Sequence, residues 1–402
     1  SGVIGNSSSG GSAFSITKVG SGTQTLSGAN TYTGSTNIDG GFLRISYDTD
    51  LKSFENSAFN INNSSTLVFV DNVASGLDRT KLTGSTFTFG ANGGSEISLE
   101  GGNHLIQGGG ATFTTNGGFK NTISSIYSGD INNQGSGNTV FNVADGSDEV
   151  DLEISAAWTT TSDTSGVLTK NGAGTMAFTG DHTGNEAIEI NAGTLEIGGS
   201  SRLNSGAFTN TITNDGVFKY NSTTDQTLSG VISGTGALTQ SGASTLTLTG
   251  ANTYTGATTV NAGTLFVNGE LGGTNVSVSA NAHFGGTGML GGDLTFDGSS
   301  FLDIVNIGDA LAITGDVTFG SGFGLDNITS WDYQNAVAGT YTLLSGSGIN
   351  LANMDNVGLV NALNLDNGNL AYFQTGSLQV VIAIPEPSPA AFIGGIGMLL
   401  LL

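Results

Sequence analysis

Short runs in which hydrophobic and polar residues alternate cover most of the chain. In the run TLTLT at 245–249, Leu246 and Leu248 alternate with threonines, so one side of the segment is apolar and the other carries hydroxyl groups. A period of two residues predicts a β-strand with one buried face. The alternation resumes at 258–260 and again at 264–267. The pattern therefore predicts short strands that are joined by tight corners.

These runs belong to a thirty-residue unit at 238–267 that recurs at 16–45 and 168–197. The first and third copies have the same residue at fifteen of the thirty positions, including the heptapeptide GANTYTG. A single unit is too small to bury its apolar side alone, whereas stacked units bury it against each other. The repeats therefore predict a solenoid of β-strands. Two sets of equivalent residues are expected to point inward: Leu26, Phe178 and Leu248, and Leu43, Leu195 and Leu265.

The third copy, GASTLTLTGANTYTGATTVNAGTLFVNG, resembles the autotransporter-associated β-strand repeat, and residues 20–45 and 172–198 are looser versions of it. The second copy differs most, because it has DHTGNE where the others have ANTYTG. The resemblance implies an all-β fold, a right-handed parallel β-helix (β-solenoid). It also implies a secreted protein, non-enzymatic in most relatives, at the outer surface of a Gram-negative bacterium or in its extracellular space.

Four segments are expected along the chain. Residues 1–13 are rich in Ser and Gly and are expected to form a flexible arm, or a strand that awaits a partner. The β-solenoid itself is expected at 14–324, and a closing β-section at 325–383. The last segment, 384–402, is a short C-terminal apolar tail.

The tail carries a second resemblance. Pro385, Glu386 and Pro387 precede an apolar segment and resemble the PEP-CTERM sorting signal, which in that family is processed by an exosortase at the inner membrane. Only thirteen residues follow Pro389, with no Arg or Lys, and this is short of the ~20 residues that span a bilayer. We therefore expect membrane contact only through this tail, before processing. A proline-rich linker before an apolar C-terminus is the alternative.

Charge restricts the partners. The chain has 32 acidic and 9 basic residues and a formal net charge of −23. Nucleic acids and anionic lipid headgroups require clustered Lys and Arg, so neither is an expected ligand. Cysteine is absent, which excludes disulfides and thiol chemistry.

The most acidic stretch, 143–158, holds the candidate chemistry. Glu149, Asp151 and Glu153 are two residues apart, and we expect them to share one solvated strand face. A Ca²⁺ site is the alternative for these three, because hard cations prefer several oxygen ligands. A carbohydrate-active enzyme, a polysaccharide lyase or hydrolase, would need two facing carboxylates at a controlled separation. We expect no enzyme here, no catalytic or cofactor-binding residue, and no cofactor other than that Ca²⁺.

The corners of the repeat are expected to be structural. Asn30 and Asn252 occupy the same corner position and are expected to stack on similar residues of adjacent rungs as a side-chain ladder that satisfies the backbone groups of the corner. Tyr32 and Tyr254 are expected to pack over that corner, with display of the rings to a glycan as the alternative. Gly34 and Gly256 are the last residues of this corner in the first and third copies, respectively.

These observations favour a structural protein, a filament subunit, matrix component or adhesin. The expected partner is a second copy of the chain, joined head to tail into a homopolymer, because the ends of a solenoid expose unpaired backbone groups. Cell-surface or matrix polysaccharide is a further candidate partner.

Overall fold

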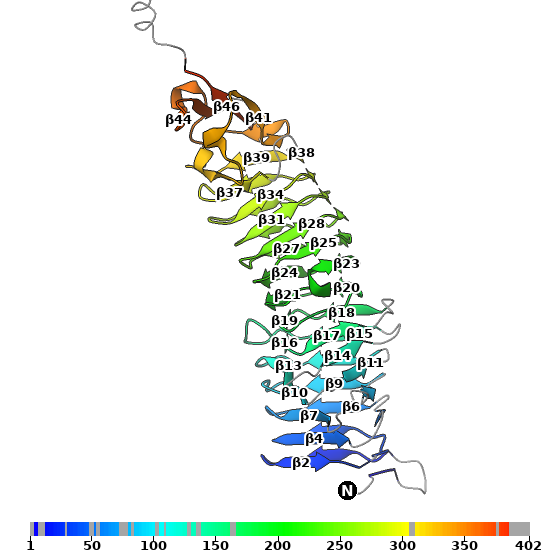
Figure 1. Ribbon diagram of the computed structural model, residues 1–402. Coiled ribbons are helices and arrows are strands. Elements are labelled where there is room, and N and C mark those ends of the chain that lie inside the picture. The colour runs from blue at the N-terminus through cyan, green and yellow to red at the C-terminus, as the bar shows by residue number, and fades with distance from the viewer. Residues whose placement is uncertain are drawn as a thin grey trace, which may run out of the picture.

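The computed structural model describes residues 4–6, 13–28, 30–47, 52–53, 57–71, 79–81, 84–100, 104–107, 110–126, 130–133, 138–160, 166–304, 310–374 and 378–385. In this part of the chain the strands stack into an elongated, gently curved rod (Figure 1). Successive turns pair through parallel ladders. The predicted parallel β-solenoid is therefore confirmed. The helices within the described residues are four 3₁₀ turns, η1 (Asn204–Gly206), η2 (Leu325–Asn327), η3 (Tyr333–Asn335) and η4 (Leu359–Asn361).

One face of the rod is a single sheet, sheet 1, that runs from the first turn to the last. Its fifteen strands pair in chain order, and their bounds follow: β2 (Thr23–Leu26), β4 (Phe42–Tyr47), β7 (Thr66–Asp71), β10 (Glu96–Glu100), β13 (Asn121–Ile126), β16 (Leu152–Ile154), β19 (Thr175–Phe178), β21 (Thr194–Gly199), β24 (Val217–Ser222), β27 (Ala237–Gln240), β30 (Thr258–Val260), β33 (Val276–Val278), β36 (Leu294–Phe296), β39 (Asp316–Phe319) and β43 (Gly348–Asn350).

A second face consists of two sheets in succession. Sheet 2 contains β1 (Ile16–Lys18), β3 (Thr36–Ile38), β6 (Ala58–Ile61), β9 (Thr86–Phe89), β12 (Thr112–Thr115), β15 (Thr139–Val143), β18 (Val167–Asn171), β20 (Ala187–Ile190), β23 (Ile212–Asn214) and β26 (Ile232–Ser233). Sheet 5 continues it with β29 (Ala251–Asn252), β32 (Glu270–Leu271), β35 (Met289–Leu290), β38 (Leu311–Ile313) and β42 (Leu344–Ser345). The two sheets meet where the Thr253 amide donates to the Ile232 carbonyl, 2.9 Å away.

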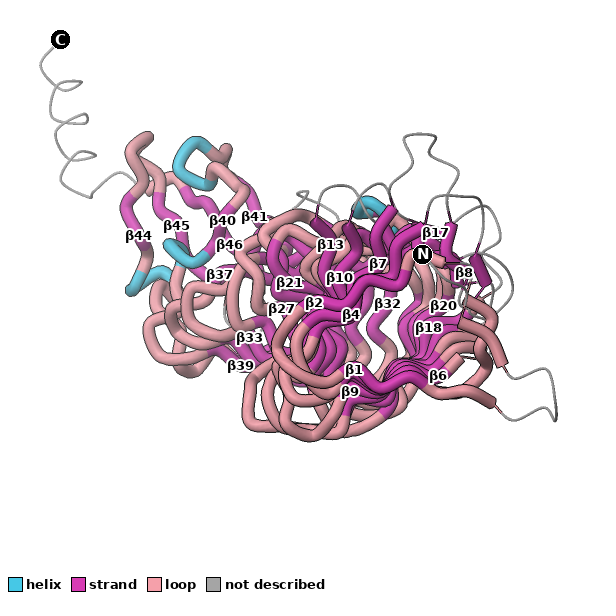
Figure 2. Tube along the Cα trace, turned by 90° about the horizontal axis from the view of Figure 1, so that it is seen from below, coloured by secondary structure: helices cyan, strands magenta, loops and turns pink. Residues whose placement is uncertain are grey.

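The third face is also divided. Sheet 3 contains β5 (Lys52–Ser53), β8 (Arg79–Lys81), β11 (His104–Gln107), β14 (Asp130–Asn133) and β17 (Ala157–Thr160). Sheet 4 contains β22 (Ala207–Phe208), β25 (Gln226–Leu228), β28 (Thr245–Leu248), β31 (Thr264–Val267), β34 (His283–Gly285), β37 (Phe301–Asp303) and β40 (Ile328–Thr329). Single bridges from Trp158 to His182 and from His182 to Leu203 connect them. Seen along the rod, the strands of each face overlie one another (Figure 2).

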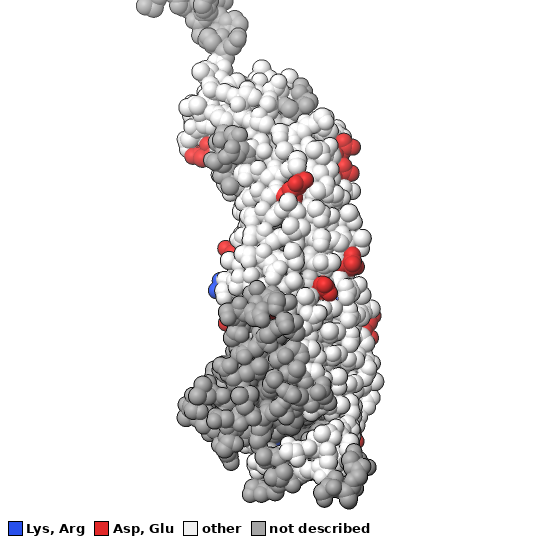
Figure 3. Space-filling model, turned by 90° about the vertical axis from the view of Figure 1, so that its right-hand side faces the viewer, with Lys and Arg blue, Asp and Glu red and all other residues white. Residues whose placement is uncertain are grey.

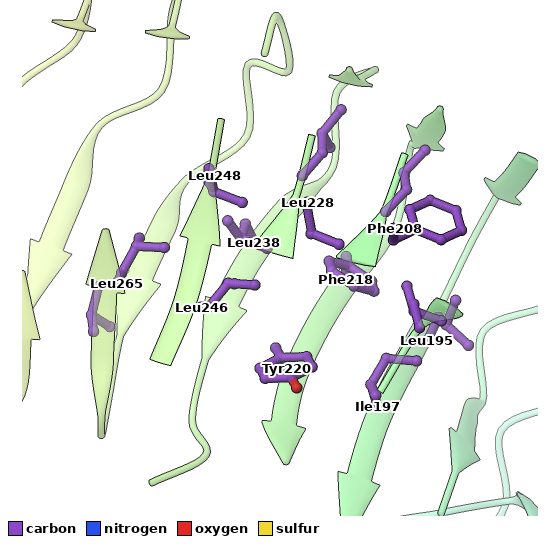
Figure 4. Packing of buried hydrophobic residues seen from close by; sticks show 14 of the residues in the cluster. Leu195, Ile197, Phe208, Phe218, Tyr220, Leu228, Leu238, Leu246, Leu248 and Leu265 are labelled. Carbon is purple, nitrogen blue, oxygen red and sulfur yellow. The ribbon is translucent and has the colours of Figure 1, made fainter. Parts of the chain in front are cut away.

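The core fills the space between the three faces. Because side chains alternate along a strand, each short strand sends its apolar residues inward and its Thr, Ser and Asn outward. In β28 the two leucines are buried and the two threonines are partly exposed. Residues such as Leu228, Leu238 and Leu248 from adjacent turns pack on one another (Figure 4). The predicted inward positions Leu43, Phe178, Leu195, Leu248 and Leu265 are at most 1 % exposed, whereas Leu26 on the first strand of sheet 1 is only partly buried.

The three repeats do not occupy equivalent faces. In the first and second copies the strands alternate between sheets 2 and 1, as β1 to β4 and β18 to β21 do. In the third copy, β27 and β30 belong to sheet 1, and β28 and β31 to sheet 4. Leu238 pairs with Thr258, so one turn uses twenty residues there and a thirty-residue unit covers one and a half turns. The third copy is therefore displaced by one face.

The solenoid extends beyond the predicted boundary at residue 324. Strands β40, β42 and β43 continue the sheets of all three faces, the last of them ending at Asn350. The closing section contributes a separate antiparallel sheet, sheet 6, in the order β41 (Gly339–Thr342), β46 (Gln379–Ala383), β45 (Leu370–Phe373) and β44 (Leu363–Asn364). The closing section is thus interleaved with the last turn, because β41 precedes β42 in the chain.

Part of the predicted flexible arm is held against the first repeat. Gly5 forms a parallel bridge with Thr31, and the Thr31 amide donates to the Ile4 carbonyl at 2.8 Å. The side-chain oxygen of Asn6 accepts from the amides of Phe14 and Thr33. Residues 4–6 therefore form a strand-like contact within their own chain. Of the predicted tail, residues 386–402 lie outside the described residues.

Candidate functional site

The corner asparagines bind backbone groups of adjacent turns. The Asn252 side-chain oxygen accepts from the Ile232 amide at 2.9 Å, and its amide nitrogen donates to the carbonyls of Gly250 and Glu270 at 3.0 and 3.1 Å. Asn30 accepts from Ile4 in the same way, at 2.9 Å. These bonds satisfy the backbone of the corner, as expected for the two asparagines, but they join side chain to backbone and do not form the expected side-chain ladder.

Asparagine ladders do form, but on the outward side of sheet 2. Asn60 donates to Asn37 at 2.7 Å, and further along the rod Asn191 donates to Asn171 at 2.9 Å. Asn171 in turn donates to Asn142 at 3.0 Å. The parallel register places these residues directly above one another, which is the condition for a ladder. Sequence spacing concealed it, since the partners are 20 to 29 residues apart.

The corner tyrosines lie over the corner and bond to the next strand. Tyr254 is fully buried, and its hydroxyl lies 2.6 Å from that of Thr258. Burial raises the pKa of the Tyr254 phenol, against the opposing effect of that hydrogen bond. Tyr32 makes the equivalent contact with Thr36 at 2.7 Å. The buried ring of Tyr254 has no surface to offer a glycan.

The corner glycines are required by close backbone contact. A Cβ atom at Gly256 would lie 2.2 Å from the Gly236 carbonyl oxygen, and one at Gly34 would lie 2.4 Å from that of Phe14. Any side chain there forces the two turns apart. These glycines are therefore structural parts of the repeat.

The second copy builds the corner with different chemistry. His182 occupies the position of Asn252, and Glu186 that of Gly256. Glu186 accepts from the Trp158 indole at 2.6 Å and lies 3.4 Å from His182, and all three side chains are buried. Burial raises the pKa of the Glu186 carboxyl, but the neighbouring His182, the backbone amide of Glu186 and the Trp158 indole together outweigh it, so the net shift is downward. Among the described residues, neither ring nitrogen of His182 has a hydrogen-bond partner.

Two lysines are buried at equivalent positions of the first and second copies, which the sequence pattern did not predict. The Lys170 ammonium, with no exposed surface, donates to three carbonyl oxygens at 2.8 to 3.1 Å: those of Asn171, Gly172 and Ala192. Lys18 does the same in the first copy. Burial lowers the pKa of Lys170 to about 8, although the Asp151 carboxylate opposes the shift. Gln240 occupies the same position in the third copy. A long side chain that can donate a hydrogen bond at one position of all three copies was the sequence signal for this buried donor.

The acidic triplet is not a shared strand face. Only Glu153 lies within a strand, β16, and its carboxylate pairs with Lys120 at 2.6 Å. That bond leads the causes that lower the pKa of Glu153. Asp151 is buried in the preceding turn, where it accepts from two backbone amides at 2.7 Å. Glu149 is exposed, 3.6 Å from Lys219. The three carboxylates therefore have different partners and do not form the Ca²⁺ site considered above.

The described residues contain no group of three or more His, Asp or Glu side chains placed to hold a metal ion. Likewise, none of the helices in the described ranges is long and apolar enough to cross a membrane.

A groove of about 280 Å³ lies on the outward side of sheet 1, over strands β2, β4, β7 and β10. Arg44 reaches across β7 and forms a two-bond ion pair with Glu100, at 2.9 and 2.5 Å. Phe42 is 46 % exposed at the edge of the groove. Ser98 lines its floor. These residues come from turns far apart in the sequence, and register alone brings them together.

Comparison with protein families agrees with the repeat. The model of the passenger-associated transport repeat matches residues 16–45, 168–197 and 238–267. A search of curated proteins and a search of solved structures gave no match. The matched segments are the three sequence repeats, whose strands lie in the stacked sheets described above. The chain therefore carries three passenger-associated transport repeats, which suggest a secreted or surface passenger protein of Gram-negative bacteria.

Proposed function

We propose that this protein is a non-enzymatic structural rod on the outside of a Gram-negative cell, a matrix component or adhesin. The main support for this proposal is the continuity of sheet 1, because its fifteen strands pair in sequence order without interruption. At ~4.8 Å between strands this ladder is about 65 Å long. A continuous ladder over a continuous core gives a stiff body, and stiffness is what a spacer or scaffold requires.

The surface chemistry supports a rod that stays soluble between cells. Outward positions are mostly Thr, Ser and Asn, and only 10 % of all residues are charged. On the side shown in Figure 3, the acidic side chains are scattered along the rod among uncharged residues. The net charge of −23 makes copies repel at long range and leaves association to short-range contacts.

Head-to-tail association is the mode of assembly that we propose. Strands β1 and β2 are the first strands of sheets 2 and 1, and each has a neighbour on one side only among the described residues. Such edges are templates for a strand of another copy. The contact of residues 4–6 with the first repeat covers the third face at this end, so sheets 1 and 2 carry the proposed junction.

The tail supplies the proposed route to the surface. In this proposal the Pro385, Glu386 and Pro387 motif is a sorting signal, and the apolar residues after it are removed. Mass spectrometry of the protein from its own cells tests this, since a mature C-terminus at the motif is expected. Recovery of the intact apolar end from the cell exterior contradicts the sorting step and leaves the rod proposal in place.

The rod proposal is tested by location and shape together. Proteinase treatment of intact cells is expected to degrade the protein, and electron microscopy of the purified chain is expected to show rods that lengthen with concentration. Rods of fixed length show that head-to-tail assembly is wrong. Full protection in intact cells, with release only on lysis, shows that the surface location is wrong. Reproducible cleavage of neutral or acidic polysaccharides contradicts the non-enzymatic role.

A further inference from the structure

We infer that the groove over β2, β4, β7 and β10 binds a neutral oligosaccharide. The inference goes beyond the structural role proposed above, because it assigns a ligand class to one place on the rod. It rests on an exposed aromatic ring, an unpartnered buried hydroxyl and a fixed ion pair that converge on one hollow. All three features belong to the described residues.

The floor of the groove offers a polar group that nothing in the described chain satisfies. Ser98 is 3 % exposed, and its hydroxyl has no hydrogen-bond partner among the described residues. A buried polar group without a partner costs free energy, so such groups are rare unless a ligand or water completes them. Ser98 lies beside Val68 in the parallel register, so a polar atom and an apolar side chain share the floor.

The walls combine an apolar plate with fixed polar groups. Phe42 lies on β4 and Glu96 on β10, and Thr66 lies between them in the same register. Two strand spacings of ~4.8 Å separate the outer pair, about 10 Å in all. An aromatic ring gives the C–H face of a pyranose a surface to stack on, while polar groups at fixed positions bind its hydroxyls.

The ion pair makes one side of the groove rigid. Arg44 and Glu100 meet through two parallel bonds, a geometry that holds both planar groups in place. Their side chains are 31 % and 24 % exposed, so both remain accessible to solvent at the groove. Glu96, in turn, accepts from the Ser124 hydroxyl. Pre-positioned groups lose little side-chain entropy on binding.

Charge selects the class of sugar. The lining holds one guanidinium, on Arg44, and two carboxylates, on Glu96 and Glu100, and the whole chain carries −23. An anionic glycan would therefore meet repulsion at close range and at a distance. Two carboxylates and hydroxyl groups accept hydrogen bonds from sugar hydroxyls without opposing charge. A neutral hexose or N-acetylhexosamine oligomer fits this lining best.

The same sheet provides an internal control farther along the rod. At β33, β36 and β39 the outward residues Ser277, Thr295 and Thr318 pair in register and form a row of small hydroxyl side chains. The Thr318 hydroxyl donates to that of Thr295 at 3.1 Å. This row has the hydroxyls of the groove without its aromatic ring, its ion pair or its unpartnered serine.

Calorimetry on the purified full chain tests the inference. The probes are the hexasaccharides of cellulose, mannan and chitin as neutral ligands, and hexagalacturonate as the anionic one. The variants are Phe42→Ala, Ser98→Ala and the control Thr295→Ala. We expect at least one neutral probe to bind, with Kd about tenfold weaker in Phe42→Ala and several-fold weaker in Ser98→Ala. Thr295→Ala is expected to bind as the parent chain does.

Ser98→Ala keeps the test decisive if Phe42→Ala does not fold. The Ser98 hydroxyl has no partner to lose, so its removal is expected to leave thermal stability unchanged or higher. The inference is wrong if no neutral probe binds at millimolar concentration, if Ser98→Ala binds like the parent chain, or if hexagalacturonate binds most tightly. None of these results bears on surface location or rod shape, which are measured separately.

Discussion

The corners of the second and third repeats show two ways to fill one position in the same fold. In the third copy, Asn252 satisfies the backbone, and Tyr254 fills the corner from within the repeat. In the second copy Gly184 occupies the position of the tyrosine. The ring of Trp158, from the preceding turn, stacks on the ring of His182, and the two ring centroids are 6.2 Å apart. The aromatic ring is thus contributed by a neighbouring turn instead of by the repeat itself.

The two corners also differ in the polar groups that they bury. The third copy bonds its corner with neutral groups, whereas the second buries a histidine and the carboxylate of Glu186. Burying a carboxylate costs free energy of desolvation, which the bond from the Trp158 indole and the neighbouring His182 have to offset. What the solenoid requires at a corner is therefore filled volume and a bonded backbone, and different residues meet this requirement at different cost.

The strongest test of the shared core compares equivalent leucines. Leu248→Asp is expected to lower the free energy of unfolding by more than about 4 kcal/mol, because it buries an unpaired charge between turns. Leu26→Asp is expected to cost much less, since Leu26 on the first strand of sheet 1 is only partly buried. Urea denaturation followed by circular dichroism measures both. Equal costs would contradict the register of the core.

A second test adds one methyl group to a corner. Gly256→Ala is expected to cost about 3 kcal/mol, because its Cβ would lie 2.2 Å from the Gly236 carbonyl oxygen. Gly22→Ala is the matched control, since a Cβ there meets no atom within 4 Å. Thermal melts of both variants measure the difference. A neutral Gly256→Ala would show that the corner has more room than the backbone contact allows.

A third test exchanges the buried donor between copies. Lys170→Met leaves three carbonyl oxygens without the donor that they share, and it is expected to cost about 2 kcal/mol. Lys170→Gln is expected to cost less, because Gln240 donates to the carbonyls of Gly242 and Ser244 in the third copy. The same denaturation experiment compares the two variants. If methionine is tolerated as well as glutamine, the donor is dispensable.

A fourth test uses the pH dependence of stability, which the corner of the second copy is expected to have through Glu186 and the neutral corner of the third copy is not. The folded-state pKa of Glu186 is lowered, so the unfolded chain binds more protons in acid and stability falls as the pH drops through that pKa. The contribution is complete above the unfolded value of about 4.3. Glu186→Gln should flatten the melting temperature between about pH 5 and 3, relative to the control Glu189→Gln. Parallel pH profiles for the two variants would show that the corner does not favour the ionised form of the Glu186 carboxyl.

The alternation and the repeat together were enough to predict a solenoid of β-strands, and the parallel pairing was expected from the family resemblance. The alternation identified the strands and the inward side of each, because those depend only on neighbours along the chain. It did not predict which face of the rod a strand joins, and the third copy lies one face away from the other two. Nor did it show that Asp151 belongs to a turn, since a run of alternating acids looks the same in a strand and in a turn.

The candidate site depended on contacts that spacing does not encode. Phe42 was visible as an aromatic residue at outward parity, next to the inward Leu43, and this was the one local signal of the groove. Arg44 and Glu100 are 56 residues apart, and turns of unequal length separate them. Only the register of β4, β7 and β10 brings them together.

The placement of the repeats limits how such a gene can change in length. Unequal recombination between the first and second copies joins segments that lie on the same faces, so every later strand keeps its place. Recombination between the second and third copies joins segments one face apart and rotates every later turn by a third of the circumference. Strands at the junction would then meet the wrong neighbours, whereas the later turns, which rotate together, keep their own pairs. Copies that look interchangeable in sequence are therefore exchangeable in only one of these two pairings.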